Sequence, residues 1–109
     1  MLAHLGNGNG AGGAVDLQVR AVQAARHGNL WIDTSSALSI LPHLVEWAVD
    51  EAGAERLLFG SDTPLYHVAL QRERIECAEI SDPAKQLILR DNAVRLFGLQ
   101  TLPASGRFA

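Results

Sequence analysis

The sequence predicts an α/β fold built from three consecutive βα units with parallel strands. Three short apolar runs lie at residues 2–5, 30–32 and 57–59, and each precedes a polar or glycine-rich turn and then helical periodicity. Short runs with little polar alternation are typical of buried strands in parallel sheets. Strands that alternate with helices indicate successive βα units, whose crossovers are right-handed.

The first two helices are predicted from apolar residues at helical spacing. The first is expected to end at Gly28, and its spaced positions are Val15, Val19, Val22 and Arg26. The second is expected to end at Gly53, with Pro42 in its first turn, where the N–H that proline lacks is not needed. Its apolar face consists of Leu41, Leu44, Val45, Ala48, Val49 and Ala52.

Two further helices are predicted towards the C-terminus. The third runs over residues 68–79 and includes Ile75. The fourth begins at Ser81-Asp82-Pro83, a polar cap followed by proline in the first turn, and ends at Gly98. Residues 100–109 are expected to form a flexible tail, which leaves residues 1–99 as the folded domain.

The composition indicates one soluble domain and excludes several classes of function. The chain has 109 residues, 48% hydrophobic and 19% charged, so a folded domain is expected. A net charge of −3 without a basic cluster predicts no nucleic-acid partner. No apolar run approaches the roughly 18 residues of a membrane span, so no membrane partner is expected. A single cysteine, Cys77, and the lack of a signal peptide predict a cytoplasmic location.

Three candidate functional residues lie at or near the ends of the apolar runs, at equal spacing. His4 and Asp33 are 29 positions apart, and Asp33 and Asp62 are again 29 apart. Because parallel strands end at one edge of a sheet, these side chains are expected to converge there. Asp62 is the first candidate, since a carboxylate at a buried strand end is costly unless it is paired or coordinated. Imidazole and carboxylate together are typical ligands of a divalent metal.

The glycines suggest a different ligand. Gly8, Gly10 and Gly13 match G-x-G-x-x-G between a strand and a helix, and Asp33 follows twenty positions after the last of them. This layout is typical of a dinucleotide site, with the pyrophosphate at the helix N-terminus and the acid on the ribose. The alternative function is therefore a noncatalytic α/β binding module that binds a nucleotide through these residues.

Four segments resemble the C-terminal part of amidohydrolase-related proteins, which are metal-dependent hydrolases with a TIM-barrel fold. The family includes decarboxylases similar to aminocarboxymuconate-semialdehyde decarboxylase. The likeness covers the chain to about Leu99. The segments are Leu2-Ala3-His4-Leu5-Gly6, Asn29-Leu30-Trp31-Ile32-Asp33-Thr34-Ser35, Gly53-Ala54-Glu55-Arg56-Leu57-Leu58-Phe59-Gly60-Ser61-Asp62-Thr63-Pro64 and Asp91-Asn92-Ala93-Val94-Arg95-Leu96-Phe97-Gly98.

The resemblance implies roles for the two strongest candidates. The three predicted strands would be strands six to eight of the barrel. The histidine that matches His4 ends strand six and is a metal ligand or an acid/base beside the metal. The aspartate that matches Asp62 ends strand eight, binds the metal and orients or deprotonates the attacking water. The implied cofactor is a divalent metal, expected to be zinc, and the implied reaction is hydrolysis or decarboxylation of a small-molecule substrate. Asp33, Thr34 and Ser35 would line the pocket.

The sequence departs from the family in what it lacks. The family's His-x-His pair at strand one and the family's strand-five histidine have no counterpart in this chain. A TIM barrel also needs eight βα units. The isolated chain is therefore expected to be weakly active or inactive. Met1 stands three residues before His4, which suggests a truncated reading frame or a fragment. Open sheet edges predict possible self-association.

Overall fold

Two short parallel strands lie at the centre of the chain. The structure is a computed structural model that describes residues 1–5, 13–35 and 42–100. Strand β1 (Ile32–Asp33) pairs with β2 (Leu57–Leu58), with Ile32 opposite Leu57 and Asp33 opposite Leu58. The residues flanking Leu2 join the other side of β1, because Leu2 forms a parallel bridge to Ile32. The three apolar runs therefore lie side by side in a mixed α/β fold, although the first forms a bridge and not a strand.

The register of this sheet differs from the equal spacing seen in the sequence. Ladder partners are 30 residues apart between Leu2 and Ile32 but 25 apart between Ile32 and Leu57. Asp62 lies four residues beyond Leu58, where a turn begins with its carbonyl accepting from the Leu65 N–H at 2.9 Å. The repeated interval of 29 residues is therefore not the sheet register.

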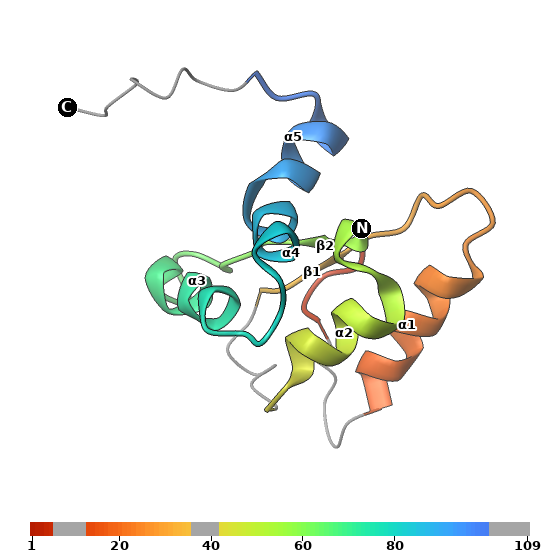
Figure 1. Cartoon of the computed structure of the whole chain (residues 1–109), viewed down its shortest axis with the longest axis horizontal. Helices are drawn as coiled ribbons and strands as arrows, with labels where there is room; N and C mark the ends of the chain where they lie inside the picture. The colour runs from red at the N-terminus through yellow and green to blue at the C-terminus, as the bar shows by residue number, and fades with distance from the viewer. Residues whose placement is uncertain (6–12, 36–41, 101–109) are drawn as a thin grey trace.

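Helices pack on both sides of the strands (Figure 1). Helix α1 (Gly13–Ala24) and helix α2 (Leu44–Ala52) lie together on one side, and α3 (Val68–Glu76) lies on the other. A short 3-10 turn, η1 (Ala54–Arg56), leads into β2. The C-terminal part consists of α4 (Asp82–Gln86), a π-helical turn η2 (Leu87–Asp91) and α5 (Asn92–Phe97).

The first two helices are shorter than predicted. Helix α1 ends at Ala24, so Arg26 and Gly28 follow it, and Gly28 adopts a φ of 59° in the next turn. Helix α2 ends at Gly53, as predicted. Pro42 lies before the helix, because His43 is the N-cap residue. The placement of Pro42 in the first turn is therefore wrong, and Leu41 lies outside the described residues.

The predicted fourth helix is interrupted by the wider π-helical turn. Ser81 caps α4 as expected, since its hydroxyl accepts from the Ala84 N–H at 3.3 Å, and Gly98 ends α5 with a φ of 61°. Within the turn, the Ile88 carbonyl accepts a bond from the Phe59 N–H at 2.9 Å. The helix backbone thus binds the exit of β2, a tertiary contact that helical periodicity could not predict.

The core lies between the sheet and the helices. Its largest fully buried side chains are Leu5, Ile32, Leu57, Ile75 and Ile88. They come from all three parallel segments, from α3 and from η2, so the core joins the strands to both layers of helices. No helix in the described ranges is long and apolar enough to cross a bilayer.

Replacing Ser81 with alanine tests the cap of α4. We expect the free energy of unfolding to fall by about 1 kcal/mol, because the Ala84 N–H loses its acceptor. Ser81→Asp keeps an acceptor and should retain the wild-type value in urea denaturation. A Ser81→Ala variant as stable as the wild type would contradict this role.

Glu46 links α2 to the segment after α3 and predicts acid sensitivity. Its Oε1 accepts from the Glu79 N–H at 2.8 Å. Burial alone would raise the pKa of Glu46, but bonds from the Glu79 and Glu46 N–H groups and nearby His43 outweigh it, so the pKa is lowered. A carboxyl with a lowered folded pKa contributes stability above its unfolded pKa and loses that contribution as the pH falls through the folded pKa.

We therefore expect the wild type to lose more stability between about pH 5 and pH 3 than Glu46→Gln does. Urea unfolding at several pH values measures this difference. The exposed residue Glu55 provides a control, since Glu55→Gln should follow the wild type. Equal pH dependence of Glu46→Gln and the wild type would contradict the assignment.

Candidate functional site

A pocket of about 350 Å³ lies where the parallel segments end. The three equally spaced candidates, His4, Asp33 and Asp62, all contribute to its lining. The rest of the wall is mainly apolar or small: Met1, Ser35, Leu58, Phe59, Gly60, Ser61, Ala93 and Phe97. This volume is within the range of small-molecule pockets.

His4 and Asp62 face each other in this pocket. His4 Nε2 lies 3.5 Å from Asp62 Oδ2, and their side chains are 37% and 28% exposed, so both are accessible to a ligand. Both backbones adopt positive φ, 61° at His4 and 58° at Asp62. Such values are uncommon outside glycine, although His and Asp are among the residues enriched there. Two strained residues that present their side chains to one another are typical of a functional site.

Asp33 lies between these two residues in the chain and beside His4 in space. Its Oδ1 accepts from the His4 N–H at 3.3 Å, from the Ser35 N–H at 2.9 Å and from the Ser35 hydroxyl. Thr34 is 1% exposed, and its hydroxyl accepts from the Gly60 N–H at 3.3 Å. Asp33 and Ser35 thus contribute to the wall, while Thr34 is buried beneath it.

Gly60 allows the ends of β1 and β2 to come together. A Cβ at this position would lie 2.8 Å from Asp33 Oδ1 and 2.9 Å from the Ser35 Cβ, closer than real Cβ atoms approach. Gly60 follows the third apolar run in the sequence, but its contact with Asp33 depends on the sheet. Any larger residue would separate the strand ends that carry the site.

The donor chemistry suits a divalent ion, but the number of donors falls short. Imidazole nitrogen and carboxylate oxygen are the donors of transition-metal sites in proteins. Within residues 1–5, 13–35 and 42–100, no cluster of three or more His, Cys, Asp or Glu could hold a metal. Catalytic zinc sites normally have three protein ligands. His4 and Asp62 therefore provide fewer protein ligands than such a site has.

The nucleotide interpretation receives no support from Asp33. Gly8 and Gly10 lie outside the described residues, and Gly13 begins α1. One oxygen of the Asp33 carboxylate is occupied by His4 and Ser35 at the strand edge. The Asp33 carboxylate thus lies in the same pocket as His4 and Asp62.

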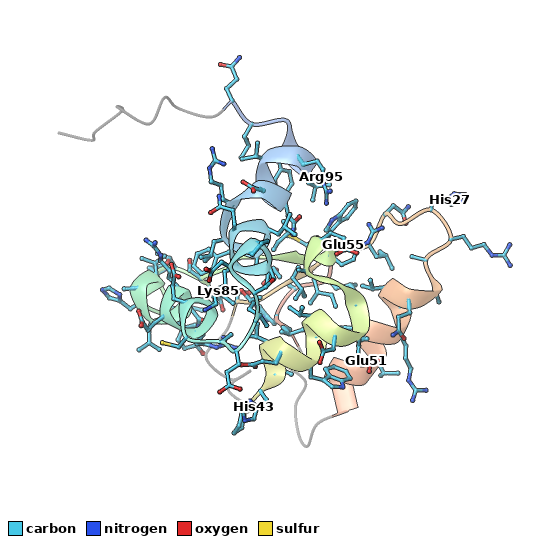
Figure 2. All side chains as sticks on the ribbon, viewed as in Figure 1. His27, His43, Glu51, Glu55, Lys85 and Arg95 are labelled. Atoms are coloured by element: carbon cyan, nitrogen blue, oxygen red, sulfur yellow. The ribbon has the colours of Figure 1, made fainter. Side chains whose placement is uncertain are left out.

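The other three histidines do not line this pocket. His27 and His43 are exposed and lie at the periphery of the molecule in Figure 2. His67 is also exposed, and its Nδ1 accepts from the Ala69 N–H at 3.3 Å, which caps α3. His67 therefore has a structural role at a helix start.

Sequence reasoning missed two residues that hold the strands in place. Asn92 is fully buried, and its Nδ2 donates to the carbonyls of Ala54 and Leu57, each at 2.7 Å. Arg74 donates to the Thr34 carbonyl at 3.2 Å, and its burial lowers its pKa. Asn92 belongs to the closing segment that resembles the family, which was its one signal in the sequence. Nothing in the sequence indicated the role of Arg74.

This combination of parallel strands and a His–Asp pair at their ends agrees with the family found by comparison. The model of the amidohydrolase family matches residues 1–99. The chain therefore belongs to the amidohydrolase family, and the resemblance seen in the sequence is confirmed. No protein of curated function matches the chain.

Several solved structures with a similar fold are decarboxylases. A 2,6-dihydroxybenzoate decarboxylase complexed with 2,6-dihydroxybenzoate is 30% identical, with a TM-score of 0.59 over 66% of this chain and 22% of that chain. The 2,6-dihydroxybenzoate decarboxylase from Rhizobium is also 30% identical, with a TM-score of 0.58 over 65% of this chain and 21% of its own.

A third structure shows the same fold with a metal. The dihydroxybenzoic acid decarboxylase from Polaromonas sp. JS666, with bound manganese and the inhibitor 2-nitroresorcinol, is 24% identical. Its TM-score is 0.60 over 85% of this chain and 25% of that chain. The chain thus spans about a fifth to a quarter of the length of these three structures.

Proposed function

We propose that this chain carries one side of the active site of a metal-dependent hydrolase or decarboxylase that acts on a small molecule. The main support is the approach of His4 Nε2 to within 3.5 Å of Asp62 Oδ2. This pair lies in a pocket at the ends of parallel segments of an amidohydrolase-family chain. Imidazole and carboxylate can both bind a metal and transfer protons at neutral pH.

The Leu2 segment, β1 and β2 would be strands six, seven and eight of an eight-stranded barrel. Their parallel order and adjacency support this assignment. Active sites of such barrels lie at the carboxyl ends of the strands, where His4 and Asp62 are found. A complete site would need strands beyond these three, so we expect weak activity or none from the 109 residues alone.

Asp62 would hold the divalent ion, and His4 would either bind it as a second ligand or act as an acid/base beside it. Manganese is bound in the structure from Polaromonas sp. JS666, and the resemblance in the sequence implies zinc. When bound, such an ion polarises a substrate oxygen and lowers the pKa of water. The donor pair suits either ion, so metal analysis must decide between them.

With His4 beside the ion and not bound to it, the same two side chains would handle the protons. In a hydrolysis, the Asp62 carboxylate accepts a proton from the attacking water, and the His4 imidazole gives one to the leaving group. In a decarboxylation, carbon dioxide leaves the substrate and a proton takes its place on the carbon. His4 Nε2 would deliver that proton.

Of the two reactions, we favour decarboxylation of a small aromatic acid. Two of the similar structures, both 30% identical, are decarboxylases of 2,6-dihydroxybenzoate. The pocket supports an aromatic substrate because apolar side chains surround the polar pair, among them Leu58, Phe59 and Phe97.

The proposal can be tested with the purified chain, Mn²⁺ or Zn²⁺, and 2,6-dihydroxybenzoate. We expect the chain to bind the metal, to bind the acid in its presence, and to release resorcinol slowly if at all. His4→Ala and Asp62→Asn should abolish binding of the acid. His27→Ala and Asp50→Asn change exposed residues and should leave it intact.

Two outcomes would contradict parts of this proposal. If the acid binds equally well without metal, or to both site variants, then the pocket is a binding site unrelated to metal chemistry. Stoichiometric metal retention with rapid turnover by the monomer would contradict the view that the site is incomplete.

A further inference from the structure

Asp33 holds the segment that carries His4 at three points. Its N–H donates to the Leu2 carbonyl at 3.0 Å, and its carbonyl accepts from the Leu5 N–H at 2.8 Å. Its side-chain Oδ1 accepts from the His4 N–H at 3.3 Å. These bonds flank His4 on both sides and hold its own backbone, so one residue of β1 fixes the position of the segment.

The bond from the His4 N–H is made at a residue whose backbone adopts an uncommon conformation. His4 has a φ of 61°, a conformation that persists when the surroundings fix it. The imidazole projects from this strained residue towards Asp62. A change at Asp33 would therefore alter the direction of the His4 side chain through the His4 backbone.

Ser35 and Gly60 hold the Asp33 side chain in turn. Ser35 donates to Oδ1 through both its N–H and its hydroxyl, which orients the carboxylate. Gly60 lies against the same oxygen, with no room for a Cβ. Since Gly60 is two residues before Asp62, the carboxylate lies between the backbones that carry the two members of the pair.

We propose that Asp33 is a positioning residue, whose carboxylate holds the His4 backbone so that the imidazole faces Asp62. Its effect on metal binding rests on the function proposed above, while its effect on His4 does not. Partners of this kind orient ligands, and their loss typically weakens metal binding by roughly 10–100-fold.

The first experiment uses the metal-free chain and its amide NMR spectrum. In Asp33→Asn, the His4 amide proton should shift upfield and exchange up to about tenfold faster, because a neutral amide oxygen replaces the charged acceptor and accepts a weaker hydrogen bond. The imidazole resonances of His4 should move as well, whereas those of the exposed His27 should not. The matched control is Asp50→Asn on the exposed face of α2, which should leave His4 unchanged.

The second experiment titrates the same variants with Mn²⁺. Asp33→Asn should weaken binding by roughly 10–100-fold, and Asp50→Asn should match the wild type. If the wild type binds no Mn²⁺, the proposed function fails, and the NMR result alone decides the role of Asp33. If the wild type binds Mn²⁺ and Asp33→Asn binds it equally well, the link to metal binding is wrong.

Ser35→Ala covers the case in which Asp33→Asn does not fold. It removes one donor to Asp33 Oδ1 and should shift the His4 resonances in the same direction by a smaller amount. Unchanged His4 amide and imidazole resonances in the folded variants would overturn the proposal.

Discussion

Replacing Asp62 with asparagine is expected to weaken Mn²⁺ binding at least about 100-fold, beyond the effect typical of residues that only orient ligands. Asparagine keeps the shape of the side chain and tolerates the φ of 58° found at this position. The substitution therefore removes the charge without a large change of backbone. Isothermal titration calorimetry with Mn²⁺ measures the change.

The control separates this effect from general electrostatics. Asp50→Asn removes the same charge from the exposed surface of α2 and should bind Mn²⁺ like the wild type. Equal weakening by both substitutions would mean that the ion responds to the net charge of −3 and not to the pocket.

The largest stability effect is expected at Asn92. Asn92→Ala removes two buried hydrogen bonds, to the carbonyls of Ala54 and Leu57, and leaves a small cavity. We expect the free energy of unfolding to fall by roughly 2–4 kcal/mol. This is a large part of the stability of a small domain. Urea denaturation followed by circular dichroism measures the loss.

Two further variants identify the cause of that loss. Asn92→Asp keeps the volume but replaces the donor with an acceptor that faces two carbonyls, so it should be at least as destabilising as Asn92→Ala. Asn29 is exposed, and Asn29→Ala should stay within about 0.5 kcal/mol of the wild type. If Asn92→Asp were as stable as the wild type, the two hydrogen bonds would not be responsible.

The sequence was informative where local pattern decides structure. The apolar runs predicted parallel segments, and these lie side by side because each has too few polar residues to face water. Ser81 and Gly98 marked ends of the C-terminal helical region because capping depends on one residue and its neighbours. The positions of His4 and Asp62 at strand ends followed from the same pattern.

The sequence was uninformative where contacts between distant residues decide structure. Equal spacing predicted that His4, Asp33 and Asp62 converge at one edge, and all three line one pocket there, but the ladder intervals of 30 and 25 residues are unequal, so the spacing does not reflect the pairing of the strands. The close approach of Gly60 to Asp33 and the bond from Phe59 to the π-helical turn also join segments far apart in the chain. Such contacts leave no periodic signal.

The most direct test is the location of Mn²⁺ on this chain, measured by paramagnetic broadening in an ¹H–¹⁵N spectrum. At substoichiometric Mn²⁺, the proposed site predicts selective broadening of the amide resonances of His4, Gly60, Ser61 and Asp62. Broadening centred on the exposed carboxylates of α3, Glu73 and Glu76, or no selective broadening at all, would contradict a metal site at the strand ends.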